Sequence, residues 1–171
     1  MTDSSTMLNR LLSKQLSNRG SPDICIAILD GLVDMAHPCF QGANITRLST
    51  LVSGDSSVDG SMSTHGTHVA SVIFGQPGTE VEGIAPRCKG LIVPVFPDDR
   101  LKTSQLDLAR GIEQAVEAGA NIINISGGQL TDFGEAEGWL ENAVNLCKAN
   151  NVLLIAAAGN DGCNCLHVPA A

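Results

Sequence analysis

The segment Ile24-Cys25-Ile26-Ala27-Ile28-Leu29 is an unbroken apolar run that ends at Asp30. A run of this length without polar alternation is typical of a strand in a parallel sheet, where both faces are covered. Runs of the same character follow at residues 91–96, 121–125 and 152–157. Pro94 in the second run predicts a bulge or an edge position, because proline lacks the N–H that a central strand donates.

Helical patterns alternate with these strands. The segment 104–118 opens on Ser104, a good N-cap, and repeats apolar residues at helical spacing until Gly119 ends it. Residues 137–150 repeat apolar side chains in the same way, and the short, mostly apolar segment 65–74 predicts a buried helix. The alternation predicts an α/β fold, a mostly parallel open sheet with helices on both faces.

Composition narrows the class of protein. The chain has 171 residues, 43% of them hydrophobic and 16% charged, which suits one folded domain and argues against disorder. Ten Lys and Arg against eighteen Asp and Glu give a net charge of −8, with no basic run, so a nucleic-acid-binding surface is not expected. The longest apolar stretch, residues 152–158, falls far short of the ~20 residues that span a membrane, so no membrane partner is expected.

The first 20 residues lack the apolar block of a secretory signal. We therefore predict an N-terminal extension at 1–20, a domain at 21–171 and a cytoplasmic location. Six cysteines could pair, but a chain without a signal usually keeps its thiols reduced. The spacing of Cys163-Asn164-Cys165 is not that of a zinc site, and no second pair is present. We expect no metal and no cofactor; Cys147 remains a candidate disulfide partner for either cysteine of that pair.

Polar residues follow three of the expected strands, Asp30 after the first, Ser126 after the third and Asn160 after the fourth. His65 follows a loop at the start of the short helix. The carboxyl ends of parallel strands share one edge of the sheet, where sites form. Acyl transfer needs these groups: a carboxylate to orient an imidazole, the imidazole to take a nucleophile's proton, and an amide to stabilise an oxyanion.

Each residue also has a simpler interpretation. Asp30, followed by Gly31, fits a turn or a helix cap. A lone histidine is more often a core or capping group than a catalytic base. Asn160 within Gly159-Asn160-Asp161-Gly162 fits a turn. Single residues therefore do not decide the function.

The surrounding segments decide more, because five of them resemble, in order, segments of the subtilisin-like serine proteases: ILDGLVDMAHP at 28–38, THGTHVAS at 64–71, GIAP at 83–86, ISGG at 125–128 and AAAGN at 156–160. They cover roughly residues 24–170, and the order Asp before His is also that of subtilisin. The resemblance implies that Asp30 is the orienting carboxylate, His65 the general base and Asn160 the oxyanion donor. It also implies a peptide substrate that pairs, as an added strand, with the backbone at Ser126, Gly127 and Gly128.

The sequence departs from this family in two places. The family has Ser or Thr directly after the aspartate, whereas Gly31 takes that place here, which shifts the turn but leaves the carboxylate available. The family's nucleophile belongs to a Gly-Thr-Ser segment well downstream of the oxyanion asparagine, and no serine here has that context. Residues 21–171 are therefore expected to be a partial subtilisin-like peptidase domain whose C-terminal part is missing, and to be inactive alone.

Three features resemble the cytoplasmic subtilisin-like proteases that mature cyanobactins by cutting ribosomal precursor peptides: the segment 30–34 (DGLVD), the Cys163–Cys165 pair and the lack of a signal or pro-segment. One branch of these proteases removes the leader, and the other macrocyclises and carries an insertion between the aspartate and the histidine. The 35 positions from Asp30 to His65 leave little room for such an insertion, which favours the leader-removing branch.

The sequence also bears on two other classes of function. A non-catalytic peptide-binding module or degenerate protease, built on the same edge at Ser126–Gly128, remains open. A nucleotide-binding domain is not supported, because no Gly-x-Gly-x-x-Gly follows the first strand and no phosphate-loop lysine is present.

Overall fold

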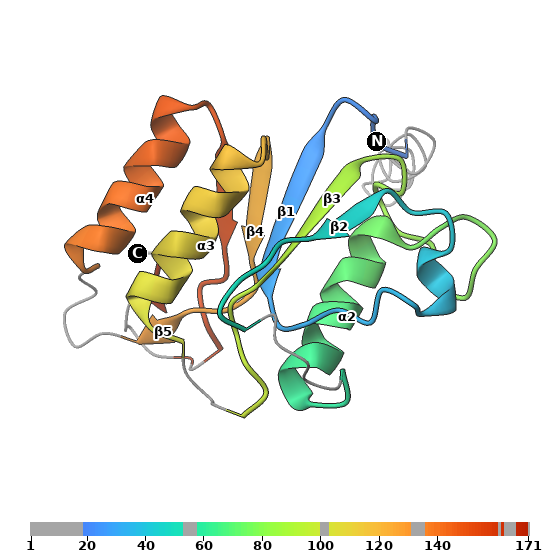
Figure 1. Ribbon diagram of the computed structural model, residues 1–171, viewed down its shortest axis with the longest axis horizontal. Helices are drawn as coiled ribbons and strands as arrows, with labels where there is room; N and C mark the ends of the chain where they lie inside the picture. Colours follow the sequence, from blue (N-terminus) through green and yellow to red (C-terminus); the bar gives the residue numbers. More distant parts are fainter. Residues whose placement is uncertain are drawn as a thin grey trace, which may run out of the picture.

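The computed structural model describes residues 19–52, 58–99, 103–130, 136–160, 162 and 167–170. Within these residues, one parallel sheet has the strand order β2-β3-β1-β4-β6 (Figure 1). Its strands are β1 (Cys25–Asp30), β2 (Ile45–Arg47), β3 (Lys89–Pro94), β4 (Ile122–Ile125) and β6 (Leu153–Ala156). A small antiparallel sheet pairs β5 (Gln129–Leu130) with β7 (His167–Val168). The prediction of a mostly parallel sheet is confirmed.

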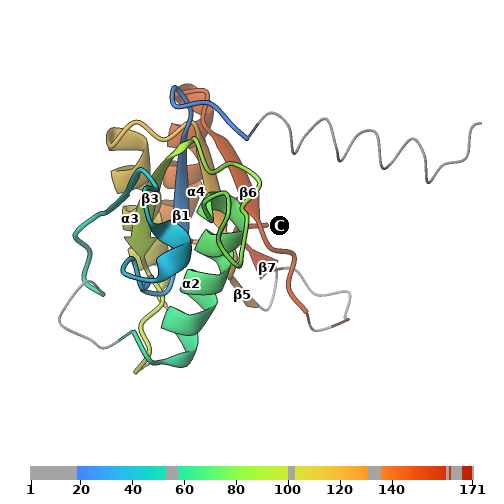
Figure 2. The ribbon, with the colours of Figure 1, turned by 90° about the vertical axis from the view of Figure 1, so that its right-hand side faces the viewer.

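Helices cover both faces of the parallel sheet, as Figures 1 and 2 show. The helix α2 (Ser61–Phe74) lies on one face, with the short 3-10 helix η1 (Pro38–Phe40) near it. The helices α3 (Gln105–Glu117) and α4 (Gly138–Ala149) lie on the other. Alternate residues of β1 serve the two layers: Ala27 and Leu29 pack toward α3 and α4, and Ile26 and Ile28 toward α2. Burial on both faces is why this strand is an unbroken apolar run.

The ends of α3 match the sequence signals. Ser104 is its N-cap, and the Ser104 hydroxyl accepts a hydrogen bond from the backbone N–H of Asp107 at 3.0 Å. The residue after the C-cap, Gly119, has a positive φ of 85°, which glycine adopts without steric cost. These two residues therefore bound the helix as predicted.

The helix α2 differs from the prediction at its start. It begins at Ser61 rather than at His65, so the histidine lies in the second turn. The residue at the N-cap, Gly60, has no side chain to signal a helix start, and the cap comes from a distant part of the chain, as described below. The strands β2, β5 and β7 were not predicted, because two or three residues are too few to show a period.

The structure places Pro94 at the end of an interior strand, at a position that has a neighbouring strand on one side only. Its strand, β3, lies between β2 and β1 and is not an edge strand. Pro94 is the last residue of β3 and pairs with Asp30 of β1. On its other side β2 has already ended at Arg47, so the N–H that proline lacks has no strand to bond there.

Four cysteines of the described part are buried free thiols: Cys25, Cys39, Cys88 and Cys147. Burial raises the pKa of Cys25, Cys39 and Cys147, which keeps these groups protonated and unreactive. The Cys163-Asn164-Cys165 pair lies outside the described residues. No helix of the described part is long and apolar enough to cross a membrane, and the described side chains include no cluster of three or more potential metal ligands.

Candidate active site

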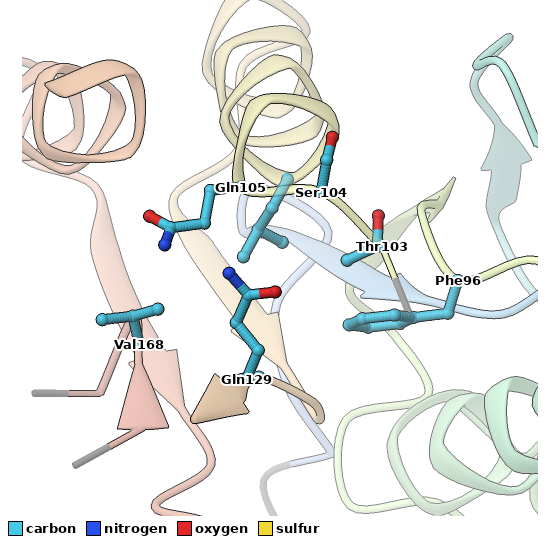
Figure 3. Close-up of a pocket in the computed structure, with 8 residues that line it drawn as sticks. Phe96, Thr103, Ser104, Gln105, Gln129 and Val168 are labelled. Carbon is cyan, nitrogen blue, oxygen red and sulfur yellow. The ribbon is translucent and has the colours of Figure 1, made fainter. Parts of the chain in front are cut away.

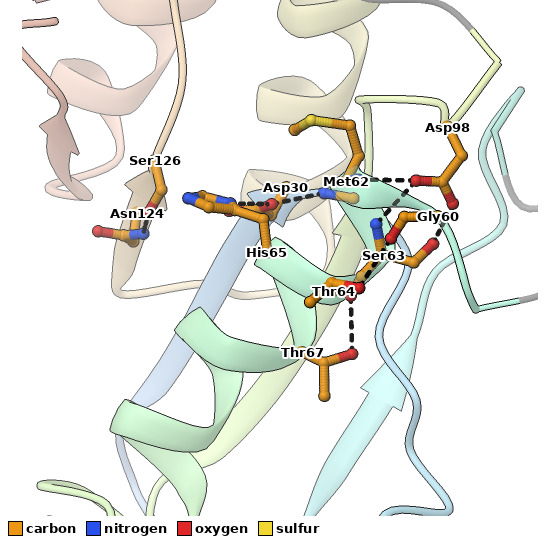
Figure 4. A network of polar contacts seen from close by, with 11 residues as sticks. Asp30, Gly60, Met62, Ser63, Thr64, His65, Thr67, Asp98, Asn124 and Ser126 are labelled. Carbon is orange, nitrogen blue, oxygen red and sulfur yellow. Dashed lines mark hydrogen bonds and ion pairs between the residues drawn. The ribbon is translucent and has the colours of Figure 1, made fainter. Parts of the chain in front are cut away.

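Asp30 and His65, which the sequence placed at one sheet edge, are in direct contact. The Nδ1 atom of His65 lies 2.8 Å from Oδ1 of Asp30. The aspartate side chain is 1% exposed and the histidine side chain 45% exposed. One ring nitrogen is thus held by a buried carboxylate, while the far edge of the ring turns toward Asn124 and Ser126 (Figure 4). An imidazole held in this way presents Nε2 to an incoming proton.

The electrostatics of Asp30 suit a partner that becomes positive. Oδ1 also accepts the backbone N–H of Gly31 at 2.7 Å, whereas Oδ2 is buried with no hydrogen-bond partner among the described residues. Burial raises the pKa of Asp30, and the hydrogen bonds from His65 and Gly31 only partly oppose it. A buried carboxylate with so few hydrogen bonds interacts strongly with any positive charge that develops on the neighbouring ring during a reaction.

Gly31, the residue that departs from the family pattern, allows the first turn of α2 to lie close to the backbone that follows Asp30. A Cβ atom built at Gly31 would lie 2.0 Å from the backbone oxygen of Met62 in the first turn of α2. One built at Gly66 would lie 2.7 Å from the backbone oxygen of Gly31. The helix that carries His65 therefore packs directly on the residue that follows Asp30. A side chain at position 31 would therefore require the first turn of α2, or the residue after Asp30, to shift.

The segment at Ser126, Gly127 and Gly128 continues the chain past the end of β4. The Ser126 hydroxyl accepts a hydrogen bond from the Asn124 side chain at 2.7 Å. A Cβ atom at Gly127 would lie 2.6 Å from the ring of Phe96. One at Gly128 would lie 2.7 Å from a backbone oxygen of β7. The fold itself thus requires glycine at positions 127 and 128. The role of Ser126, Gly127 and Gly128 in binding a peptide stays a prediction.

A small pocket opens beside Gly128, between the β3–α3 loop and β5 (Figure 3). It is lined by Phe96, Thr103, Ser104, Gln105, Leu108, Gly128, Gln129 and Val168. Apolar groups of Phe96, Leu108 and Val168 meet polar side chains of Gln105 and Gln129 in this lining. A pocket of this composition can take one side chain of an extended peptide that lies along residues 126–128.

Asn160 lies where the sequence placed it, a few residues past β6 and at the same sheet edge as Asp30. It is exposed, and its side chain forms no hydrogen bond to another described residue. Within the part of the chain that the structure describes, Asp30 and His65 are thus brought together, and the amide of Asn160 has no hydrogen-bond partner. Its oxyanion role stays a prediction.

Two polar residues of this region were missed by sequence reasoning. Asn124 stands inside the otherwise apolar run at 121–125, and a polar side chain within a buried strand is a signal that could have identified it. Asp98 caps α2 through three hydrogen bonds, described below. The sequence Pro97-Asp98-Asp99 gives no sign of this, because the helix that Asp98 caps begins 37 residues earlier.

Comparison with known proteins identifies the family to which this site is similar. The model of the subtilase family matches residues 21–171. The thermophilic serine proteinase of Bacillus sp. (strain AK1) is 34% identical over 155 residues, which are 89% of this chain and 37% of that protein. The solved structure of the prenylagaramide maturation protease PagA is 66% identical, with a TM-score of 0.84 over 93% of this chain and 55% of that one.

Two further solved structures differ widely in their sequence identity to this chain. The patellamide maturation protease PatA is 72% identical, with a TM-score of 0.78 over 88% of this chain and 54% of that one. The PatG macrocyclase domain is only 28% identical, with a TM-score of 0.79 over 93% of this chain and 57% of that one. The chain thus spans about half the length of these solved structures. The similarity to the maturation proteases PatA and PagA confirms the resemblance inferred from the sequence.

Proposed function

Because the chain belongs to the subtilase family, we propose that it supplies the acid–base half of a serine endopeptidase site. The observation that carries this proposal is the 2.8 Å hydrogen bond between His65 Nδ1 and Asp30. In the reaction, His65 takes the proton of a serine hydroxyl as its oxygen attacks the peptide carbonyl. The charge that develops on the imidazole is stabilised by Asp30, and the carbonyl oxygen accepts a hydrogen bond from Asn160. His65 then returns the proton to the leaving amine.

The serine in this proposal comes from outside the 171 residues. Leu153 and Ile155 of β6 are 56% and 49% exposed. They pair with Ile122 and Asn124, so they lie on the face of the sheet that α2 covers farther along. Two large, exposed apolar side chains that lie next to each other on one face of a sheet indicate that further polypeptide packs over them. The solved structures of PagA and PatA, of which the matched part of this chain covers 55% and 54%, have the length to provide it.

The substrate in this proposal is a ribosomal precursor peptide. An extended peptide would pair with the backbone at residues 126–128 and place one side chain in the pocket at Phe96. Identity of 66–72% to the maturation proteases PagA and PatA, against 28% to the PatG macrocyclase domain, favours cleavage of a leader over macrocyclisation. Such an enzyme would act in the cytoplasm, where its precursor is made.

A chimera tests this function. Residues 21–171 of this chain would replace the matching part of PagA, and the product would be assayed on a prenylagaramide precursor peptide. We expect cleavage within about tenfold of the PagA rate, because the segment supplies a competent Asp–His pair. A folded chimera that binds the peptide without cutting it would instead support the non-catalytic peptide-binding alternative.

Asn160 gives a prediction that separates an oxyanion donor from a turn residue. In the chimera, Asn160→Ala should lower kcat by about 10²–10³, or ~2.7–4 kcal/mol, a magnitude known for subtilisin rather than calculated here. KM should change little, because the amide contact strengthens only as the carbonyl oxygen gains charge. The control is Asn150→Ala, which removes a hydrogen bond to the Leu146 backbone at the end of α4. A lower Tm with unchanged kcat for Asn160→Ala would make it a turn residue.

A further inference from the structure

The N-terminus of α2 is capped by a residue from another part of the fold. Gly60 stands at the N-cap with extended backbone (φ −81°, ψ 170°) and offers no side-chain hydrogen bond. The carboxylate of Asp98, in the loop after β3, takes that place. Its Oδ1 accepts the backbone N–H groups of Met62 at 2.7 Å and of Ser63 at 3.0 Å. The hydroxyl of Ser63, which is fully buried, donates to Oδ2.

These donors are the ones that an N-cap side chain normally satisfies, the N–H groups of the second and third helical residues. A carboxylate at this end of a helix also complements the positive end of the helix dipole. Desolvation opposes the charged form of Asp98, but the hydrogen bonds from Ser63 and Met62 outweigh it and hold its pKa below the usual value. Asp98 therefore stays ionised at neutral pH.

The absence of a side chain at Gly60 leaves space for the Asp98 carboxylate at the N-terminus of α2. A Cβ atom built there would lie 2.0 Å from Cγ and 2.2 Å from Oδ1 of Asp98. Any other residue at the N-cap would displace the carboxylate, so the glycine and the distant aspartate form a matched pair. Figure 4 shows Asp98 on one side of the first turn of α2 and Asp30, with His65, on the other.

We propose that Asp98 is a positioning residue for His65. The first turn of α2 is held between two fixed points, Asp98 at its backbone N–H groups and Gly31 against the backbone oxygen of Met62. His65 follows two residues after Ser63, so a shift of this turn moves the imidazole relative to Asp30. The same loop carries Phe96, which packs on Gly127. It therefore joins the helix of the base to the segment where a peptide would lie.

The functional meaning of this inference rests on the proposed role of His65, but its test needs no catalysis. The ring ¹⁵N chemical shifts of His65 in the 171-residue chain, at a pH where the imidazole is neutral, report which nitrogen carries the proton. We expect the Nδ1–H tautomer in the unchanged chain, because Nδ1 donates to Asp30. In Asp98→Ala the two tautomers should mix, and Tm should fall by about 2–8 °C, the size expected for a lost helix cap.

The matched control is Ser104→Ala, which removes the N-cap of α3, a helix that carries no member of the Asp–His pair. Its Tm should fall by a similar amount while His65 keeps the Nδ1–H tautomer. The rescue is the exchange Asp98→Gly with Gly60→Asp, which moves the carboxylate to the N-cap of α2 itself. The backbone there already has the extended conformation of a capping residue, so tautomer and Tm should both return toward those of the unchanged chain.

Two results would overturn the proposal. One is an Asp98→Ala chain whose His65 stays in the Nδ1–H tautomer as fully as before. The other is an exchanged chain whose tautomers remain mixed, and this result stands even if Asp98→Ala fails to fold. Because neither measures cleavage, a chimera that fails to cut its substrate would leave the positioning role standing and remove only the proposed function.

Discussion

His65→Ala in the chimera is expected to lower kcat by about 10⁶, a size known for the base of subtilisin and carried over here. The reason is geometric: the ring is held on Asp30 through Nδ1 and has its other nitrogen available, so no other described group can take the serine proton from the same position. Steady-state kinetics on the precursor peptide measure the effect.

The matched control for that substitution is His68→Ala. His68 lies on the same helix three residues later and is exposed, whereas the ion pair with Asp30 is made by His65. Its loss should leave kcat within a fewfold of the unchanged chimera. Near-normal turnover of His65→Ala, or an equal loss at His68, would remove His65 from the mechanism.

Asp30→Asn is expected to lower kcat by roughly 10⁴, a magnitude known for the orienting aspartate of another triad protease. The amide keeps the size of the side chain and can still accept the N–H of Gly31, but it has no charge to stabilise the imidazolium. Burial makes this charge matter: at 1% exposure, water does not screen it from His65.

The pKa of Asp30 sets the direction of a pH effect for the same pair. Because burial raises that pKa, the carboxylate is neutralised at a higher pH than an exposed aspartate as the solution is acidified. Activity of the unchanged chimera should therefore fall on acidification, as the Asp30 carboxylate takes up a proton and loses its charge. The control for Asp30→Asn is Asp34→Asn. The Asp34 carboxylate lies on the same segment and accepts a hydrogen bond from the N–H of Ala36. An Asp30→Asn chimera with the turnover of this control would contradict the orienting role.

The sequence predicted the parts of this molecule that rest on continuous patterns. The apolar runs gave the four longer strands of the sheet, because burial on both faces leaves a run of Val, Ile, Leu and Ala. The polar residues at strand ends placed Asp30 correctly, at the sheet edge formed by the carboxyl ends of the parallel strands. His65 was placed with it by the resemblance to a family, not by any period.

What could not be predicted depends on contacts between distant segments. The start of α2 was placed four residues late because its cap, Asp98, comes from a loop 37 residues after the helix begins. The reason for Gly31 is a backbone oxygen of Met62 that no local pattern reveals. The short strands β2, β5 and β7 are defined by pairing with strands from other parts of the chain, and their own two or three residues show no period.

The central claim, that this chain holds the acid–base pair while the nucleophile lies outside it, is tested by labelling with a fluorophosphonate probe that reacts with activated serines. The 171-residue chain should remain unlabelled. The chimera should be labelled on a serine contributed by PagA, and His65→Ala should abolish that label, because the base is what activates the hydroxyl. A label mapped by mass spectrometry to any serine of the 171-residue chain would contradict the claim.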